Sequence, residues 1–208
     1  MHLLCFRVLG GEPWITLVRR GVNEESGPLT LKCEHQEAGG GAAGDAKVGG
    51  YSIRGHAVAT ATDDREIVIE GRREGTRPWR SQGLPLLSAQ VGQLRGAAGP
   101  EYLVTLERRS SPIDNEAGAR PYVYEAGPEG LVARWRGSAL AWPLIDAALL
   151  PSSDGVLCAL HRRDSFLVLQ PSSEGVRTAA YRWNGFGFSG VDDPAVVARC
   201  RVLFDVAR

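Results

Sequence analysis

The side chains best able to do chemistry in this sequence are a few cysteines and histidines. The cysteines are Cys5, Cys33, Cys158 and Cys200. None belongs to a C-x-x-C pair, the spacing that lets two thiolates reach one metal ion from a single turn. In a strand, His35 would share a face with Cys33, but no local spacing supplies further ligands. We therefore predict no metal site and free, buried cysteine thiols.

His161 has the best local arrangement for nucleophilic catalysis, because Asp164 and Ser165 follow it closely. In a turn, however, Asp and Ser side chains usually bond to the nearby backbone. Cys158 and His161 would point to opposite faces of a strand, which predicts a core cysteine near an exposed histidine. The G-x-S-x-G elbow and the glycine motifs of phosphate and dinucleotide sites are absent. We expect no catalytic residue and no cofactor.

Arginine carries nearly all of the positive charge, since lysine occurs only at Lys32 and Lys47. Four strand-like segments each end in a pair of arginines. The first members of these pairs are Arg19, Arg72, Arg108 and Arg162, with spacings of 53, 36 and 54 residues. If the segments are repeats, their guanidinium groups could surround one anionic substrate. They could equally lie on an outer rim, each paired with a nearby acid.

The overall charge argues against a nucleic acid partner, because 24 basic residues balance 24 acidic ones. Hydrophobic residues at 43% and charged residues at 23% are typical of globular proteins. No stretch approaches the roughly 18 to 20 apolar residues of a membrane-spanning helix. Residues 2–9 are a short apolar segment that Arg7 interrupts, unlike a secretory leader. This slightly favours the cytoplasm, although an exported chain whose leader was removed would look the same.

Short β-branched or aromatic runs bounded by Gly, Pro, Asp or Ser predict β-strands. Examples are residues 14–18, 66–70, 102–106, 156–160 and 166–169. Two segments could be helical: residues 139–150, which Pro143 interrupts, and residues 193–203, where Pro194 suits a first helical position. The pattern predicts an all-β chain.

A glycine-rich segment interrupts the pattern of strands. Residues 37–50 contain Gly39-Gly40-Gly41 and Gly49-Gly50. Such a segment has few side chains that can pack. We predict a flexible surface loop at about residues 37–50, within a single domain of residues 1–208.

Other sequence similarities accompany the arginine pairs. Trp79-Arg80 and Trp135-Arg136 are each followed by a glycine, a proline and an apolar segment, and each precedes an Arg-Arg strand. Glu-Gly at 174–175 leads to Trp183 as Glu-Gly at 129–130 leads to Trp135. The recurring order predicts repeats near the roughly 40 to 50 residues of a propeller blade. Duplicated β-meanders in a sandwich or barrel are the alternative.

Residues 154–191 contain Asp154-Gly155, a leucine-rich strand and an aromatic stretch that ends Trp183-Asn184-Gly185-Phe186-Gly187-Phe188. They resemble blades of bacterial β-propellers related to the FG-GAP and VCBS repeats, and the resemblance is best in the C-terminal half. It implies a small propeller and a binding role. Those families commonly bind calcium through a D-x-D-G-D-G loop. Here the corresponding loop keeps one carboxylate, Asp154, so calcium is not implied.

Two functions follow from these patterns. The first is a non-catalytic binding or scaffold module for a protein or polymer, because tryptophan and phenylalanine rings often dominate binding surfaces. Its candidate residues are Trp183, Phe186 and Phe188. Most of the tryptophan and phenylalanine rings, including Trp79, Trp135 and Trp142, are expected to pack between blades. Phe186 and Phe188 are the expected exceptions, because Gly185 and Gly187 favour a turn that projects their rings outward. The alternative is an enzyme whose arginine-lined channel, including Arg108 and Arg162, binds an anionic substrate.

The ends of the chain suggest how a ring of repeats would close. Residues 2–9 and 200–206 are both short and apolar, and neither has an obvious hairpin partner nearby. A ring must cover its first and last strand edges, because open edges expose unpaired backbone groups. We predict that these two segments are strands of the same blade or sheet.

Overall fold

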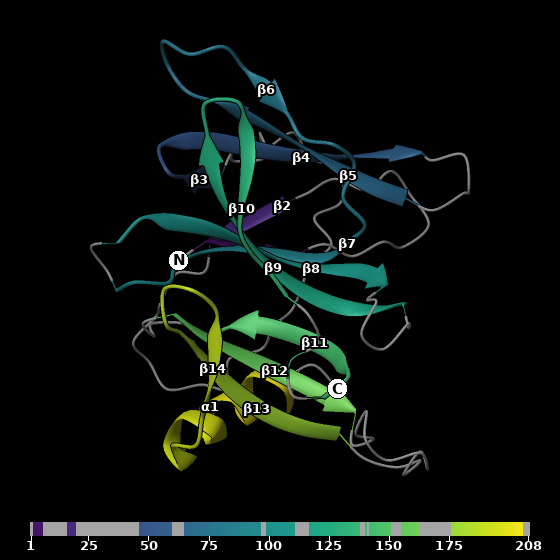
Figure 1. Cartoon of the computed structure of the whole chain (residues 1–208), viewed down its shortest axis with the longest axis vertical. Coiled ribbons are helices and arrows are strands. Elements are labelled where there is room, and N and C mark those ends of the chain that lie inside the picture. The colour runs from purple at the N-terminus through teal and green to yellow at the C-terminus, as the bar shows by residue number, and fades with distance from the viewer. Residues whose placement is uncertain are drawn as a thin grey trace.

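The computed structural model describes residues 2–5, 16–19, 46–59, 65–96, 99–110, 117–137, 140, 142–150, 155–162 and 176–205. These residues fold almost entirely into antiparallel strands, with one helix (Figure 1). The all-β class predicted from the sequence is confirmed. The predicted strand at 166–169 lies outside the described residues.

Three successive groups of four neighbouring strands form antiparallel meanders. The first meander contains β3 (Ala46–Val48), β4 (Tyr51–Ala59), β5 (Arg65–Arg72) and β6 (Trp79–Arg80). The second contains β7 (Leu86–Gln93), β8 (Glu101–Ser110), β9 (Ala117–Gly127) and β10 (Gly130–Arg136). The third contains β11 (Leu144–Leu149), β12 (Val156–Arg162), β13 (Val176–Trp183) and β14 (Phe188–Val191). Beside β7 lies β1 (His2–Cys5), which also pairs with β2 (Thr16–Arg19).

The meanders stack as layers, with the second between the other two (Figure 1). The first is a separate four-stranded sheet, whereas the second and third share a ten-stranded sheet. These two halves are joined through β9 and β11 by one residue pair, Ala119 with Leu144, so the sheet folds over on itself. Among the described strands, no sheet closes into a ring.

The sequence of β8 shows why the second meander lies in the middle. Leu103 packs toward the first meander, while Tyr102 and Val104 pack toward the third. All three side chains are buried, as expected for a strand covered on both faces. Because both faces of β8 are covered, this strand needs a continuous run of apolar residues, whereas a strand with one face in water would alternate apolar and polar residues.

The far face of the third meander is covered by α1 (Pro194–Asp205). The Asp193 side chain accepts a hydrogen bond from the Ala195 backbone N–H at 2.9 Å, which caps the helix. Pro194 occupies the first helical position, as the sequence predicts. Cys200, Leu203 and Phe204 lie on one face of the helix and are buried against the sheet.

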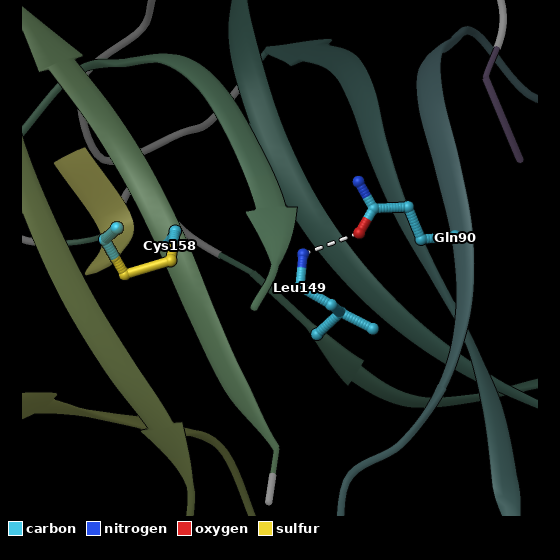
Figure 2. The surroundings of a disulfide bond; sticks show 4 residues. Gln90, Leu149 and Cys158 are labelled. Atoms are coloured by element: carbon cyan, nitrogen blue, oxygen red, sulfur yellow. Dashed lines mark hydrogen bonds between the residues drawn. A yellow bond between two sulfur atoms is a disulfide. The ribbon is translucent and has the colours of Figure 1, made fainter. Parts of the chain in front are cut away.

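A disulfide joins Cys158 of β12 to Cys200 of α1 (Figure 2). The prediction of free thiols is therefore wrong for these two cysteines. They are 42 residues apart, and their pairing depends on the packing of α1 on β12, which local spacing does not show. Cys33 lies outside the described residues.

The predicted pairing of the chain ends is also wrong, because residues 200–205 belong to α1 and not to a strand. The N-terminal segment forms β1, which lies next to β7. The capping Asp193, Pro194 and the apolar face of the helix outweigh the strand-like composition of residues 200–206.

The end of the glycine-rich segment is ordered into a hairpin, in contrast to the predicted loop at 37–50. Ala46 and Val48 of β3 are fully buried. Gly49 and Gly50 form the tight turn to β4 with φ of 56° and 80°, a conformation that favours glycine. Residues 37–45 lie outside the described part of the chain.

The segment 139–150, one of two with helical potential, contains a strand. β11 pairs with β9 only at Leu144, so the residues of β11 that follow have no partner among the described strands on the side of the second meander. The Gln90 side chain crosses from β7 and accepts a hydrogen bond from the Leu149 N–H at 2.5 Å (Figure 2). A buried amide thus finds its acceptor in the neighbouring layer.

Candidate functional site

A cavity of about 250 Å³ lies where the second and third meanders join. The lining comes from the adjacent ends of β7, β8, β9, β11 and β12. The lining residues are Leu87, Arg108, Ala117, Gly118, Ala119, Arg120, Pro143, Leu144, Ile145 and Arg162. Of these described lining residues, three are arginines and none is acidic, so the charged groups that they bring to the cavity are all guanidinium groups.

Arg108 and Arg162 reach this cavity from corresponding places in two meanders. Arg108 lies near the end of the second strand of its meander, and Arg162 is the last residue of the second strand of its own. The backbone N–H of Arg108 donates to the Pro85 carbonyl oxygen, and that of Arg162 donates to the Pro143 carbonyl oxygen, both at 2.9 Å. The same local backbone arrangement therefore positions both arginines.

A β-bulge beside each arginine completes the correspondence. The register of β7 against β8 shifts between Leu86 and Ser88, which leaves Leu87 as the extra residue. The register of β11 against β12 shifts in the same way around Ile145. A bulge changes the direction of its extra side chain, and here Leu87 and Ile145 are 40% and 43% exposed.

The neighbouring acid Glu107 is directed away from Arg108, because successive side chains of a strand point to opposite faces. Its buried carboxylate accepts hydrogen bonds from Tyr124 at 2.8 Å, Thr105 at 2.9 Å and the Arg109 Nε at 2.9 Å. Burial lowers the pKa of Arg109, but the hydrogen bond and charge of Glu107 outweigh it and raise that pKa. Glu107 is thus paired with Arg109 on the face opposite Arg108.

His161 occupies the place in the third meander that Glu107 occupies in the second. It lies opposite Leu144, as Glu107 lies opposite Leu86. His161 is fully buried, with Nε2 2.9 Å from the Tyr181 hydroxyl oxygen. The predicted exposed histidine is therefore wrong. Burial lowers the pKa of His161, and the charge of Arg177 lowers it further, while the backbone of Trp142 and Pro143 opposes the shift.

Of the four arginines considered from the sequence, Arg108 and Arg162 lie at the same cavity. Arg72 lies at the end of the third strand of the first meander, where its Nη2 is 3.9 Å from the Glu70 carboxylate. Arg19 ends β2, and its side chain is outside the described part of the structure. Of these four arginines, Arg108 and Arg162 therefore share a cavity, whereas Arg72 belongs to a separate ion pair.

The aromatic residues near the C-terminus separate into packed and exposed rings. Trp183 is 6% exposed and belongs to the core between the second and third meanders. Phe188 packs against this core, with its ring edge-on to Trp135 and Trp183. The expected outward projection of Phe188 is therefore not observed.

Phe186 is 88% exposed at the tip of the turn between β13 and β14. The Asn184 side chain accepts hydrogen bonds from the backbone N–H groups of Phe186 and Gly187, both at 2.9 Å. Arg95 donates to the Gly185 carbonyl oxygen at 3.3 Å. These bonds hold the turn in shape, so the prediction of a partner contact in this turn now depends on Phe186.

Sequence reasoning missed Arg120, Leu87 and Ile145. Arg120 is isolated in the sequence and lies 4% exposed in β9. Leu87 and Ile145 did carry a signal, because each follows a Pro-Leu pair after one of the Trp-Arg segments. That similarity indicated corresponding positions, but a bulge was needed to make both side chains line a cavity.

Within the described residues, no three or more His, Cys, Asp or Glu side chains are grouped to hold a metal ion. The one helix in this part of the chain is too short and too polar to cross a membrane. No protein-family model, no curated protein and no solved structure matches this chain. The resemblance to FG-GAP and VCBS repeats stays a prediction.

Proposed function

We propose that this protein is a non-catalytic binding module that recognises an anionic group in the cavity between its second and third meanders. The observation that carries the proposal is that Arg108, Arg120 and Arg162 line one cavity, to which the described part of the chain contributes no acidic side chain. Guanidinium groups bind carboxylates and phosphates through paired, charge-assisted hydrogen bonds. Such bonds are stronger than neutral ones, so this lining favours an oxygen-bearing anion.

The size of the site favours a small ligand or a terminal group. Its volume of about 250 Å³ is below the roughly 300 to 1,000 Å³ of sites for drug-sized molecules. Arg108 and Arg162 are exposed, so their charges remain accessible from solvent. Glu107 and His161 are buried side chains that could act as a general acid or base, and neither lines the cavity. This supports binding in preference to the alternative of an enzyme.

The second part of the proposal concerns the origin of the site. We propose that the second and third meanders are repeats of one unit, related to propeller blades. The support is the shared bulge, the matching hydrogen bond from arginine to proline and the face-to-face stacking of four-stranded meanders. Duplication of one unit would explain how corresponding arginines of two meanders came to line one cavity.

Anion titration tests the proposed function. We expect acetate and inorganic phosphate, added at low ionic strength, to shift the guanidinium and backbone NMR signals around Arg108 and Arg162. The double variant Arg108→Gln/Arg162→Gln should bind each anion more weakly, by about tenfold per arginine, because each loses a hydrogen bond to a charged group.

Arg72→Gln is the matched control, since Arg72 is 72% exposed on the first meander and outside the cavity. It should bind both anions as the unchanged protein does. If the double variant and the control bind equally well, or if the unchanged protein shows no saturable shift, the proposal is wrong.

A further inference from the structure

We propose that the ligand of the arginine-lined cavity is an amphiphile, a carboxylate or phosphate that carries a short apolar group lying against Leu87 and Ile145. This inference rests on the proposed function and adds the chemical class of the ligand. Its basis is the position of two exposed aliphatic side chains on the lining of a cationic cavity.

Exposed aliphatic residues are ordinary when they are scattered singly over a surface. In this protein, however, two such residues line the same cavity. The large hydrophobic residues that are exposed within the described chain are Leu87, Val132, Ile145, Val176, Phe186 and Val202. Leu87 and Ile145 line the cavity, and Val176 lies opposite Arg162 in the register of β12 and β13. Apolar surface and positive charge are therefore concentrated at one place.

The backbone explains why these side chains are exposed. Without the bulges, Leu87 and Ile145 would continue the regular alternation of β7 and β11 between two buried faces. The bulge gives each residue a separate direction, and in both meanders that direction leads to the lining of the same cavity. The two corresponding bulges thus place two apolar side chains in the lining of one cavity.

The arginines and the two aliphatic side chains line the same cavity, so a ligand that contacts both needs an apolar group close to its anionic group. Arg108 and Leu87 line the cavity from the second meander, while Arg162 and Ile145 line it from the third. A small inorganic anion could contact the arginines but would leave both aliphatic side chains in water. An apolar substituent on the anion would displace that water, and this is favourable in proportion to the area buried.

A chain-length series of ligands tests the inference with the complete protein. Acetate, butyrate and hexanoate are titrated at equal ionic strength by calorimetry or NMR, and inorganic phosphate is compared with phenyl phosphate. We expect affinity to rise by up to about fourfold for each methylene group that becomes buried, and phenyl phosphate to bind more tightly than phosphate. Whichever series binds more tightly identifies the preferred charged group.

The double variant Leu87→Ser/Ile145→Ser should lose the gain in affinity from acetate through butyrate to hexanoate, measured as the ratio of affinities within the variant. Both side chains are partly exposed, so thermal melting should confirm that the variant is folded. Val132→Ser is the matched control, because Val132 is 46% exposed on β10 and does not line the cavity. It should keep the whole chain-length dependence.

The outcomes separate this inference from the proposed function. If acetate and phosphate bind but affinity is independent of the apolar group, the ligand is a simple anion and the inference is overturned. If chain length matters equally in the double variant, the apolar contact lies elsewhere and the inference is also overturned. If no anion binds, the proposed function itself fails.

Discussion

The second and third meanders have the same local plan at the cavity but differ in how the rest of each layer is stabilised. Both have a bulge, a proline carbonyl that accepts from an arginine N–H, and a buried polar residue before that arginine. In the second meander that residue is Glu107, within a network of charged and hydroxyl groups. In the third it is His161, whose ring lies near Tyr181 and Trp142.

The two meanders also differ in what covers their outer faces. The second is covered by the first meander through apolar packing, including Leu103 and Tyr124. The third is covered by α1, which the disulfide between Cys158 and Cys200 links to β12. One backbone arrangement can thus tolerate different buried groups, provided that each group finds partners suited to its charge.

Removal of the disulfide should give the largest effect and should act mainly on the third meander. For Cys158→Ala/Cys200→Ala we expect a loss of about 4 kcal/mol in the free energy of unfolding, from loop-closure entropy over the 42-residue separation. Urea unfolding measures this loss, and hydrogen exchange should show α1 amides exposed before those of β8. A reducing agent should destabilise the unchanged protein and leave the variant unaffected. Equal stability of the two proteins would contradict the prediction.

Removal of Glu107 should act on the second meander with a somewhat smaller effect. Glu107→Ala leaves the Tyr124 and Thr105 hydroxyls without their buried acceptor, and Arg109 without its partner. We expect a loss of about 3 kcal/mol, the low end for breaking a buried ion pair, because the Arg109 side chain is 40% exposed and can reach water.

Glu125→Ala is the control for the Glu107 variant, since Glu125 forms an ion pair with Arg134 that is open to solvent. Denaturant unfolding should show a change below about 1 kcal/mol for this surface pair. Equal losses in the two variants would mean that the buried network around Glu107 does not stabilise the second meander.

Acid should lower the stability of the folded protein through the buried His161 of the third meander, and we expect this effect to be the smallest of the three. Burial keeps the pKa of His161 below its value in the unfolded chain, about 6.5. Below that pH the unfolded chain takes up a proton that the folded chain does not, so stability should fall by up to about 1.4 kcal/mol per pH unit. At neutral pH both states are neutral at this residue, and the effect disappears.

Unfolding measured between pH 7 and pH 5 checks this expectation. His161→Gln should remove that part of the pH dependence, whereas His56→Gln, on the first meander, should retain it. If the pH dependence is the same in the unchanged protein and His161→Gln, protonation of His161 does not limit stability in acid.

The sequence alone determined those features that depend on neighbouring residues. Short apolar runs between turn residues predicted the strands that became β5, β8 and β12, because alternation and turn formation are local properties. Pro194 after Asp193 predicted the start of α1 for the same reason. The similarity of the two Trp-Arg segments also has a structural counterpart, since Trp79 and Trp135 both lie in the fourth strand of a meander.

Only the tertiary structure decided which distant groups meet. The Glu-Gly similarity misled, because Trp135 lies in the fourth strand of its meander and Trp183 in the third strand of its own. The disulfide, the burial of His161 and the cavity between Arg108 and Arg162 all depend on how layers far apart in sequence pack together. Packing of this kind is set by the summed burial of many side chains, and local spacing does not contain that sum.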